Sequence, residues 1–155
     1  HIIQPKQGDK TMRLTTKSRY GTRMVLDIAI NGKDRPVPVS EISRRQNISV
    51  KYLEKLISKL KTSNILQSHR GPFGGHNLSK PPSEITIGKL VRLFEDKGAI
   101  TECAEVDKTS CKECDQAGEC MTQWVWIQAG NAMFDRLDSI TIDDLLKKCE
   151  NDSIF

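Results

Sequence analysis

The chain has 155 residues, of which 37% are hydrophobic and 28% are charged. This length predicts one domain of ordinary size, or a small domain with an appendage. No apolar run approaches the roughly 18 residues that a membrane-spanning helix needs, so we expect no membrane partner. The start of the chain shows neither a long apolar segment nor a small-residue cleavage site. We therefore expect a cytoplasmic protein with reduced thiols.

The net charge of +4 conceals an uneven distribution along the chain. Residues 12–80 carry 14 Lys or Arg against 4 Asp or Glu, whereas residues 81–155 carry 8 against 15. The basic part has the charge expected of a module that binds a polyanion such as nucleic acid. A merely solvated basic surface is the alternative.

Apolar residues at helical spacing predict three helices in the basic part. The first is expected over residues 18–31, with an inner face of Tyr20, Met24, Val25 and Ile28. Ser40 is the expected N-cap of a second helix over 41–46, and Ser49 is the expected N-cap of a third that ends near residue 63. Its inward positions are Leu53, Leu56, Ile57 and Leu60, and its outward positions are Lys51, Glu54, Lys55, Ser58 and Lys59.

A β-hairpin is predicted directly after the third helix. Residues 65–70 and 76–79 are expected to form its strands, and the glycine-rich segment 71–75 its tip. Three helices and a hairpin make a winged helix-turn-helix, so the predicted fold class is mainly α with a small β-hairpin wing. In this fold the third helix can lie in a DNA major groove about 12 Å wide, while the wing reaches the flanking minor groove or backbone.

The remainder of the chain predicts a second functional region. Thr86 is expected to cap a fourth helix, a long apolar helix is expected over 121–137, and a short final helix is expected to end near Lys148. The apolar surface of the long helix is too broad for one buried stripe, so one face can meet a second copy of the chain. The expected division is a cloning remnant or disordered segment (1–11), a DNA-binding domain (12–82), a cysteine loop (101–120) and dimerisation helix within 83–148, and a tail (149–155).

Four of the five cysteines lie within eighteen residues, in the order Cys103-x7-Cys111-x2-Cys114-x5-Cys120. The surrounding residues are acidic and turn-forming, so no apolar core is available for these thiols to fill. Closely spaced thiolates suit zinc or an iron–sulfur cluster, and four cysteines would complete a tetrahedral zinc site. The thiols could instead be redox-active or inert. Cys149 stands apart, and we expect no role for it.

The order and spacing of several motifs resemble the Rrf2 family of bacterial winged-helix regulators, especially its iron–sulfur members of the IscR and NsrR type. The matching segments are Met12-Arg13-Leu14-Thr15, Arg19-Tyr20, Ile48-Ser49-x-x-Tyr52-Leu53-Glu54, Arg70-Gly71-Pro72-x-Gly74-Gly75, Cys114-x5-Cys120, Trp126 and residues 138–146. The resemblance implies a homodimer joined through the long helix. It also implies a 2Fe-2S or 4Fe-4S cluster and a double-stranded DNA operator as partner.

The family pattern implies three cluster ligands, Cys103, Cys114 and Cys120. IscR-like members space their cysteines evenly and place a His three residues after the last, but this loop is longer and that position holds Gln123. NsrR-like members use an acidic residue near the N-terminus, where this chain has Arg19. The fourth ligand is therefore open, and Cys111 is either that ligand or a spare thiol.

The outward face of the third helix and the wing supply the expected DNA contacts. The resemblance implies contacts from Lys51, Tyr52, Glu54 and Arg70, and the exposed position of Lys55 adds a fifth. Glu can accept a hydrogen bond from cytosine N4, and Lys or Arg can reach guanine or phosphate. Glu54 could instead pair with neighbouring lysines of its own helix, and Tyr52 could merely cap the core.

The sequence contains no catalytic triad, phosphate-cradling loop or paired carboxylates in an apolar setting, so we expect no enzyme. We predict a homodimeric transcription regulator of the repressor kind. Its cluster would sense redox, iron, nitric oxide or sulfur status. A cluster-free regulator with zinc or redox-active thiols is the alternative, and an iron–sulfur electron carrier is a weaker one.

Overall fold

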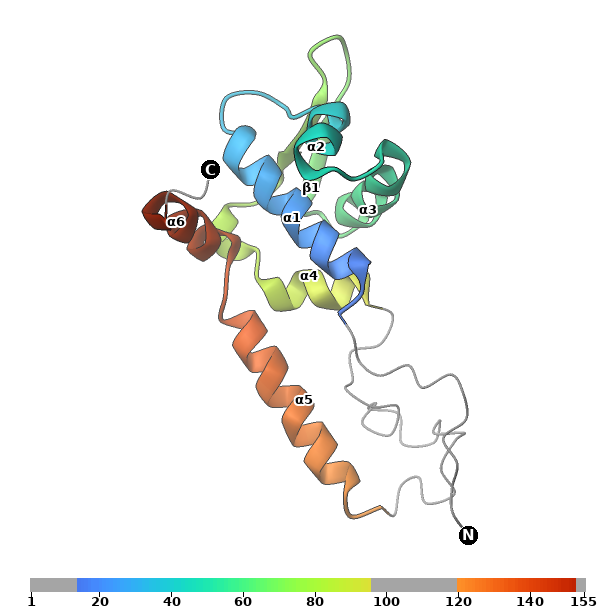
Figure 1. The fold of residues 1–155 in the computed structure, drawn as a ribbon, viewed down its shortest axis with the longest axis vertical. Helices are drawn as coiled ribbons and strands as arrows, with labels where there is room; N and C mark the ends of the chain where they lie inside the picture. The colour runs from blue at the N-terminus through green and yellow to red at the C-terminus, as the bar shows by residue number, and fades with distance from the viewer. Residues whose placement is uncertain (1–13, 96–119, 153–155) are drawn as a thin grey trace. The chain divides into compact units, whose positions relative to one another are not determined.

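The computed structural model describes residues 14–95 and 120–152. Its elements are α1 (Thr16–Asn31), α2 (Val39–Gln46), α3 (Val50–Thr62), β1 (Leu66–His69), β2 (Gly75–Leu78), a 3-10 helix η1 (Pro82–Glu84), α4 (Ile87–Phe94), α5 (Gln123–Asp138) and α6 (Ile142–Asp152) (Figure 1). They divide into two units, one of residues 14–95 with 134–152 and one of residues 120–133. The predicted fold class, mainly α with a two-stranded antiparallel hairpin, is confirmed.

The larger unit is built around one apolar core. Met24, Val25 and Ile28 on the inward face of α1 are buried as expected, whereas Tyr20 is half-buried. The predicted stripe of α3 is also buried, with Leu53, Leu56, Ile57 and Leu60 all at most 5% exposed. Phe94 of α4 and Ile142 of α6 belong to the same core. Each such side chain contributes roughly 1.5–3 kcal/mol on burial, so α3 is held firmly on its inner side.

The turn between α2 and α3 is tight, as a helix-turn-helix requires. Asn47 ends α2 in the left-handed conformation, at φ 53°, which asparagine tolerates better than most residues. The Ser43 hydroxyl donates to the Ile48 carbonyl at 2.6 Å and closes the turn. Ser49 then caps α3 by accepting from the Tyr52 amide at 3.3 Å, which confirms the predicted cap.

Several helix ends differ from the prediction. The expected Ser40 cap is wrong: α2 begins at Val39, because the extended Pro38 directs its carbonyl to the amides of Glu41 and Ile42 at 3.1 and 3.3 Å. Helix α1 starts two residues earlier than expected, at Thr16, and α5 starts two residues later. Helix α6 continues to Asp152, so Cys149 lies within a helix.

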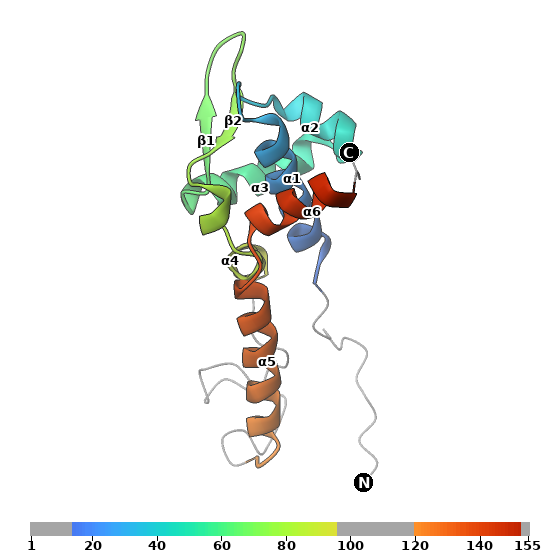
Figure 2. The ribbon, with the colours of Figure 1, turned by 90° about the vertical axis from the view of Figure 1, so that its left-hand side faces the viewer.

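The wing is anchored at its base to the linker between α1 and α2 (Figure 2). Strands β1 and β2 pair from Leu66 with Leu78 to His69 with Gly75. On the other side of β2, His76 and Val37 exchange two backbone hydrogen bonds of 2.9 Å. A Cβ on Gly75 would lie 2.5 Å from the Val37 carbonyl carbon, so this pairing requires glycine. The hairpin therefore projects from a fixed base.

The chain returns to the larger unit at the C-terminal end of α5. Arg92 of α4 makes a bidentate ion pair with Asp138 at 2.7 and 2.8 Å and lies 4.2 Å from the ring centre of Phe134. The Ile87 amide donates to the Ile140 carbonyl at 2.8 Å. The core thus includes residues on both sides of position 82. The assignment of DNA binding to residues 12–82 stays a prediction.

Candidate nucleic-acid interface

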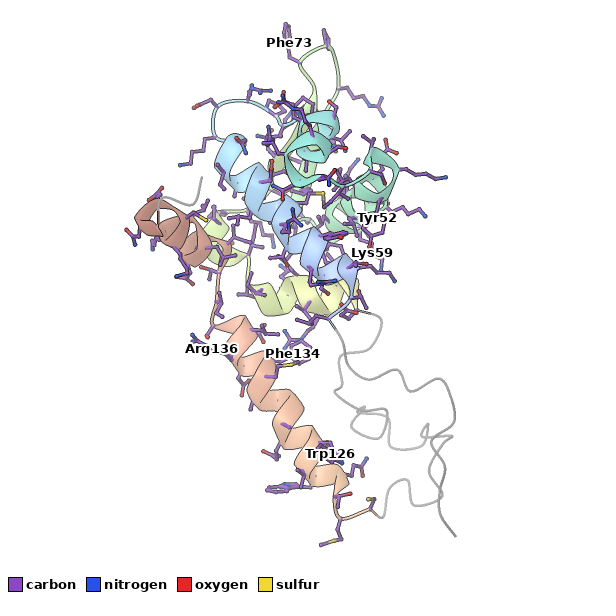
Figure 3. All side chains as sticks on the ribbon, viewed as in Figure 1. Tyr52, Lys59, Phe73, Trp126, Phe134 and Arg136 are labelled. Carbon is purple, nitrogen blue, oxygen red and sulfur yellow. The ribbon has the colours of Figure 1, made fainter. Side chains whose placement is uncertain are left out.

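Helix α3 presents a polar face because its opposite face is fixed in the core. Lys51, Glu54 and Lys55 are all exposed, as is Lys59 further along (Figure 3). Within the described part of the chain, the Glu54 carboxylate has no ion pair or hydrogen bond with the lysines of its helix. The carboxylate of Glu54 and the ammonium groups of Lys51 and Lys55 thus share one exposed face of a helix of a size that fits a major groove.

Tyr52 lies differently from the other predicted contacts of α3. It is half-buried, shares a 3.3 Å hydrogen bond between its hydroxyl and that of Thr16, and packs edge-on against Tyr20 at 6.0 Å between ring centres. Figure 3 shows it on the side of α3 nearest the start of α1. The geometry gives Tyr52 a role in joining α3 to α1, and its contact with DNA stays a prediction.

The wing brings further groups to the surface. Arg70 is exposed immediately after β1, next to the glycine-rich tip. Ser68 and His76 share a 2.9 Å hydrogen bond across the strands. Burial lowers the pKa of His76, and the nearby charge of Lys61 lowers it further, so its neutral form is favoured. Phe73, at the tip, is 91% exposed, and no sequence pattern marked it as a functional residue.

A buried carboxylate that sequence reasoning missed positions α2. Asp27 of α1 is 3% exposed and accepts three hydrogen bonds from the Arg45 guanidinium at 2.7 to 3.2 Å and a fourth from the Gln46 amide at 2.7 Å. Because α2 packs on α3, this network also orients the helix that would read DNA. A signal was available, since an aspartate on the apolar face of a helix needs a partner.

Most of the cysteine tract lies outside the part of the chain that the structure describes. Cys103, Cys111 and Cys114 lie outside the described residues, and only Cys120 is described, just before α5. Its sulfur lies 3.0 Å from the Thr122 hydroxyl, and hydrogen bonds from the Thr122 side chain and backbone lower the pKa of the thiol. A lower pKa increases the fraction of thiolate, which is the form that binds metals. Among residues 14–95 and 120–152, no three potential ligand side chains cluster to hold a metal.

The first turns of α5 expose large apolar side chains in the smaller unit. Trp124 is 67% exposed, Trp126 is 43% exposed, and Val125 between them is 45% exposed. Gln123 is the first residue of α5. These exposed apolar side chains lie on the helix that was predicted to form the dimer.

Comparison with known proteins identifies the family. A model of the Rrf2 family, described as "Iron-dependent Transcriptional regulator", matches residues 14–148. The chain belongs to the Rrf2 family of transcriptional regulators. The protein rrf2 of Nitratidesulfovibrio vulgaris is 42% identical over 136 residues, which cover 88% of each chain. This confirms the resemblance inferred from the motifs and the expectation of a DNA-binding regulator rather than an enzyme.

Solved structures of Rrf2 relatives share the fold. IscR of T. potens aligns with a TM-score of 0.71 and 31% identity over 90% of each chain. CymR, the global cysteine regulator of B. subtilis, aligns with a TM-score of 0.70 and 28% identity, over 88% of this chain and 98% of its own. None of the described helices is both long and apolar enough to cross a bilayer.

Proposed function

We propose that this Rrf2 protein is a homodimeric, cytoplasmic repressor that reads an operator with α3 and the wing, and that its cysteine tract holds an iron–sulfur cluster. The observation that supports this most directly is the exposed row of Lys51, Glu54 and Lys55 on a helix whose other face is fully buried. Such a helix can enter a major groove as a rigid body, without rearranging the core that holds it.

The charges of this row assign different tasks to its members. Lys51 and Lys55 are attracted to phosphates, which gives affinity without sequence preference. The Glu54 carboxylate is repelled by phosphates, so its presence in a polyanion groove is favourable only if it accepts a hydrogen bond from a base such as cytosine. Since no described neighbour neutralises it, Glu54 is the residue that would read sequence.

The test compares Glu54→Ala with Lys51→Ala on duplexes selected from a random pool by the wild-type protein. Glu54→Ala should retain or raise non-specific affinity and lose roughly 1–3 kcal/mol of discrimination at one base pair per half-site. Lys51→Ala should instead weaken binding to all duplexes and flatten its salt dependence, because one phosphate contact is lost. Equilibrium binding at several salt concentrations measures both effects.

Lys147→Ala is the matched control, because it removes the same charge from α6, which lies across α1 from α3 (Figures 1 and 2). It should bind like the wild type. If Glu54→Ala kept the wild-type base preference in apo and holo protein, α3 would not read sequence through this carboxylate. Specificity would then come from the wing or from DNA shape.

The cysteine part of the proposal rests on the family and on the setting of Cys120. The chain offers four thiols in this tract, and hydrogen bonds from Thr122 lower the pKa of the one that is described, Cys120. A bound cluster would supply an iron centre sensitive to redox state, iron, nitric oxide or sulfur supply. A coupling of only ~1–3 kcal/mol between the tract and the DNA-reading residues would change operator occupancy several-fold or more.

The metal is tested by anaerobic purification, an absorption spectrum, and iron and sulfide counts. If Cys103, Cys114 and Cys120 are the ligands of an iron–sulfur cluster, the protein should be coloured and should bleach in air. Cys114→Ala should then lose the chromophore. Cys111→Ala is the control, since unchanged iron would mark Cys111 as a spare thiol. Colourless protein with one zinc per chain after reconstitution would favour the tetrahedral zinc site. Metal-free protein whose DNA binding changes on thiol oxidation would favour a redox regulator.

A further inference from the structure

The tip of the wing is a hydrogen-bonded turn that presents a single aromatic ring. The Gly74 amide donates to the Gly71 carbonyl at 2.9 Å, which closes a four-residue β-turn with Pro72 and Phe73 at its centre. Proline at the second position fixes the backbone of this turn, and Gly71 supplies a φ of +112° that other residues rarely adopt. Phe73 therefore occupies a defined place rather than a flexible loop.

Nothing in the larger unit covers the Phe73 ring. The side chain is 91% exposed, and Figure 3 shows it at the outermost point of the hairpin, directed away from the helices. The base of the same hairpin is fixed by the Val37–His76 backbone pair and by the Asn77 amide, which donates to the Gly32 carbonyl at 2.8 Å. A rigid hairpin thus carries an apolar ring away from the core without giving it a partner in its own unit.

The surroundings of this ring indicate the kind of partner that it meets. Arg70 lies three residues before it on the same tip and is exposed, and strand β1 starts directly after α3. When α3 occupies a major groove, a wing beside it reaches the adjacent minor groove. Proteins that use this groove often insert an apolar side chain at a base step, while nearby basic groups contact the phosphates.

We propose that Phe73 is a DNA contact that enters the minor groove, packs against the deoxyribose walls and partly unstacks one base step. This inference rests on the proposed DNA-reading function and adds a contact that carries no charge. Pyrimidine–purine steps unstack most easily, so a TA or CA/TG step should be preferred beneath the wing. Phe73 would thus contribute to sequence preference without any hydrogen bond to a base.

The test uses the full chain, held anaerobically, and duplexes selected from a random pool by the wild-type protein. Phe73→Ser should weaken binding to these duplexes by on the order of tenfold, as expected for loss of an aromatic contact with bases. Phe73→Leu, which keeps an apolar wedge, should lose less. Both variants should melt like the wild type, because a ring that is 91% exposed contributes almost no packing to the larger unit.

Two further measurements distinguish a wedge from a phosphate contact. The slope of log affinity against log salt should be unchanged in Phe73→Ser, whereas Arg70→Gln should make it shallower. A thymine placed at the step beneath the wing should react with permanganate in the wild-type complex but not in the Phe73→Ser complex, because only unstacked thymines react. The proposed wedge would be wrong if Phe73→Ser bound as tightly as the wild type and no thymine reacted with permanganate in the wild-type complex. That result would leave the proposed function of α3 intact. Failure of the wild type to select any duplex would overturn both proposals.

Discussion

At the scale of single residues, Asp27 joins α1 to α2 through a buried carboxylate. Asp27→Ala should lower the free energy of unfolding by roughly 1.5–3 kcal/mol, because the Arg45 guanidinium and the Gln46 side-chain amide lose the carboxylate that accepts their hydrogen bonds. The double variant Asp27→Ala/Arg45→Ala should lose less free energy of unfolding than the sum of the losses in the two single variants. Urea denaturation measures these differences.

Glu41 offers a control for the Asp27 experiment. It pairs with the same Arg45 guanidinium at 3.1 Å but lies at the surface, where solvent weakens ion pairs. Glu41→Ala should therefore destabilise the protein much less than Asp27→Ala. Equal losses in the two variants would contradict the view that burial makes the Asp27 pair important.

Sequence reasoning succeeded for residues whose partners are close in the chain. The caps at Ser49 and Thr86 were predictable because each side chain accepts from an amide three residues further on. The contacts of Glu95 were not predictable. Its carboxylate accepts from the Thr15 amide at 2.8 Å and from the hydroxyls of Thr15 and Ser18, which lie some eighty residues earlier in the sequence. No local pattern marks that contact, because only the packing of α4 against α1 brings the groups together.

At the scale of secondary-structure elements, α1 approaches α4 closely at Gly21. A Cβ on Gly21 would overlap the ring of Phe94, which is fully buried and cannot move aside. Overpacking of this kind costs roughly 1–3 kcal/mol, more than the ~1 kcal/mol that alanine gains over glycine in a helix. Gly21→Ala should therefore lower the melting temperature.

A second substitution isolates this steric cause. Phe94→Leu removes the ring atoms that the new methyl group would meet, so adding Gly21→Ala to it should be neutral or stabilising. Thermal unfolding of the four combinations forms a double-mutant cycle. If Gly21→Ala destabilised both backgrounds equally, the approach of the two helices would not be its cause.

The type of each element was more predictable than its ends. The inner stripe of α3 was correct because four leucine and isoleucine side chains follow the helical period. The start of α2 was missed because the carbonyl of Pro38, rather than a serine side chain, meets the first free amides. Phe73 was missed because an aromatic residue in a glycine-rich turn follows no period, and only its exposure distinguishes it.

At the scale of the whole molecule, the exposed start of α5 should join two copies of the chain. Burial of Trp124, Val125 and Trp126 against a second copy would remove apolar surface from water, at about 25 cal/mol per Å². Sedimentation at micromolar protein should therefore show a dimer, and Val125→Glu should shift it toward monomer. Val125→Glu should also weaken binding to a two-fold symmetric operator, because its half-sites could no longer be engaged together.

Phe73→Ser is a control for the assembly, since it removes an exposed apolar side chain from the wing instead of from α5. It should leave the dimer unchanged. A wild-type chain that sediments as a monomer and still binds a symmetric operator tightly would contradict the proposed assembly.

The placement of the tryptophans has an optical consequence. The chain has only two tryptophans, and both lie in the first turns of α5, while α3 and the wing contain none. Intrinsic tryptophan emission therefore reports on the surroundings of α5 alone. A shift to shorter wavelength would follow burial of that helix in a dimer. A change in emission when an operator is added would show that events at α3 reach α5, and no label would be needed to detect it.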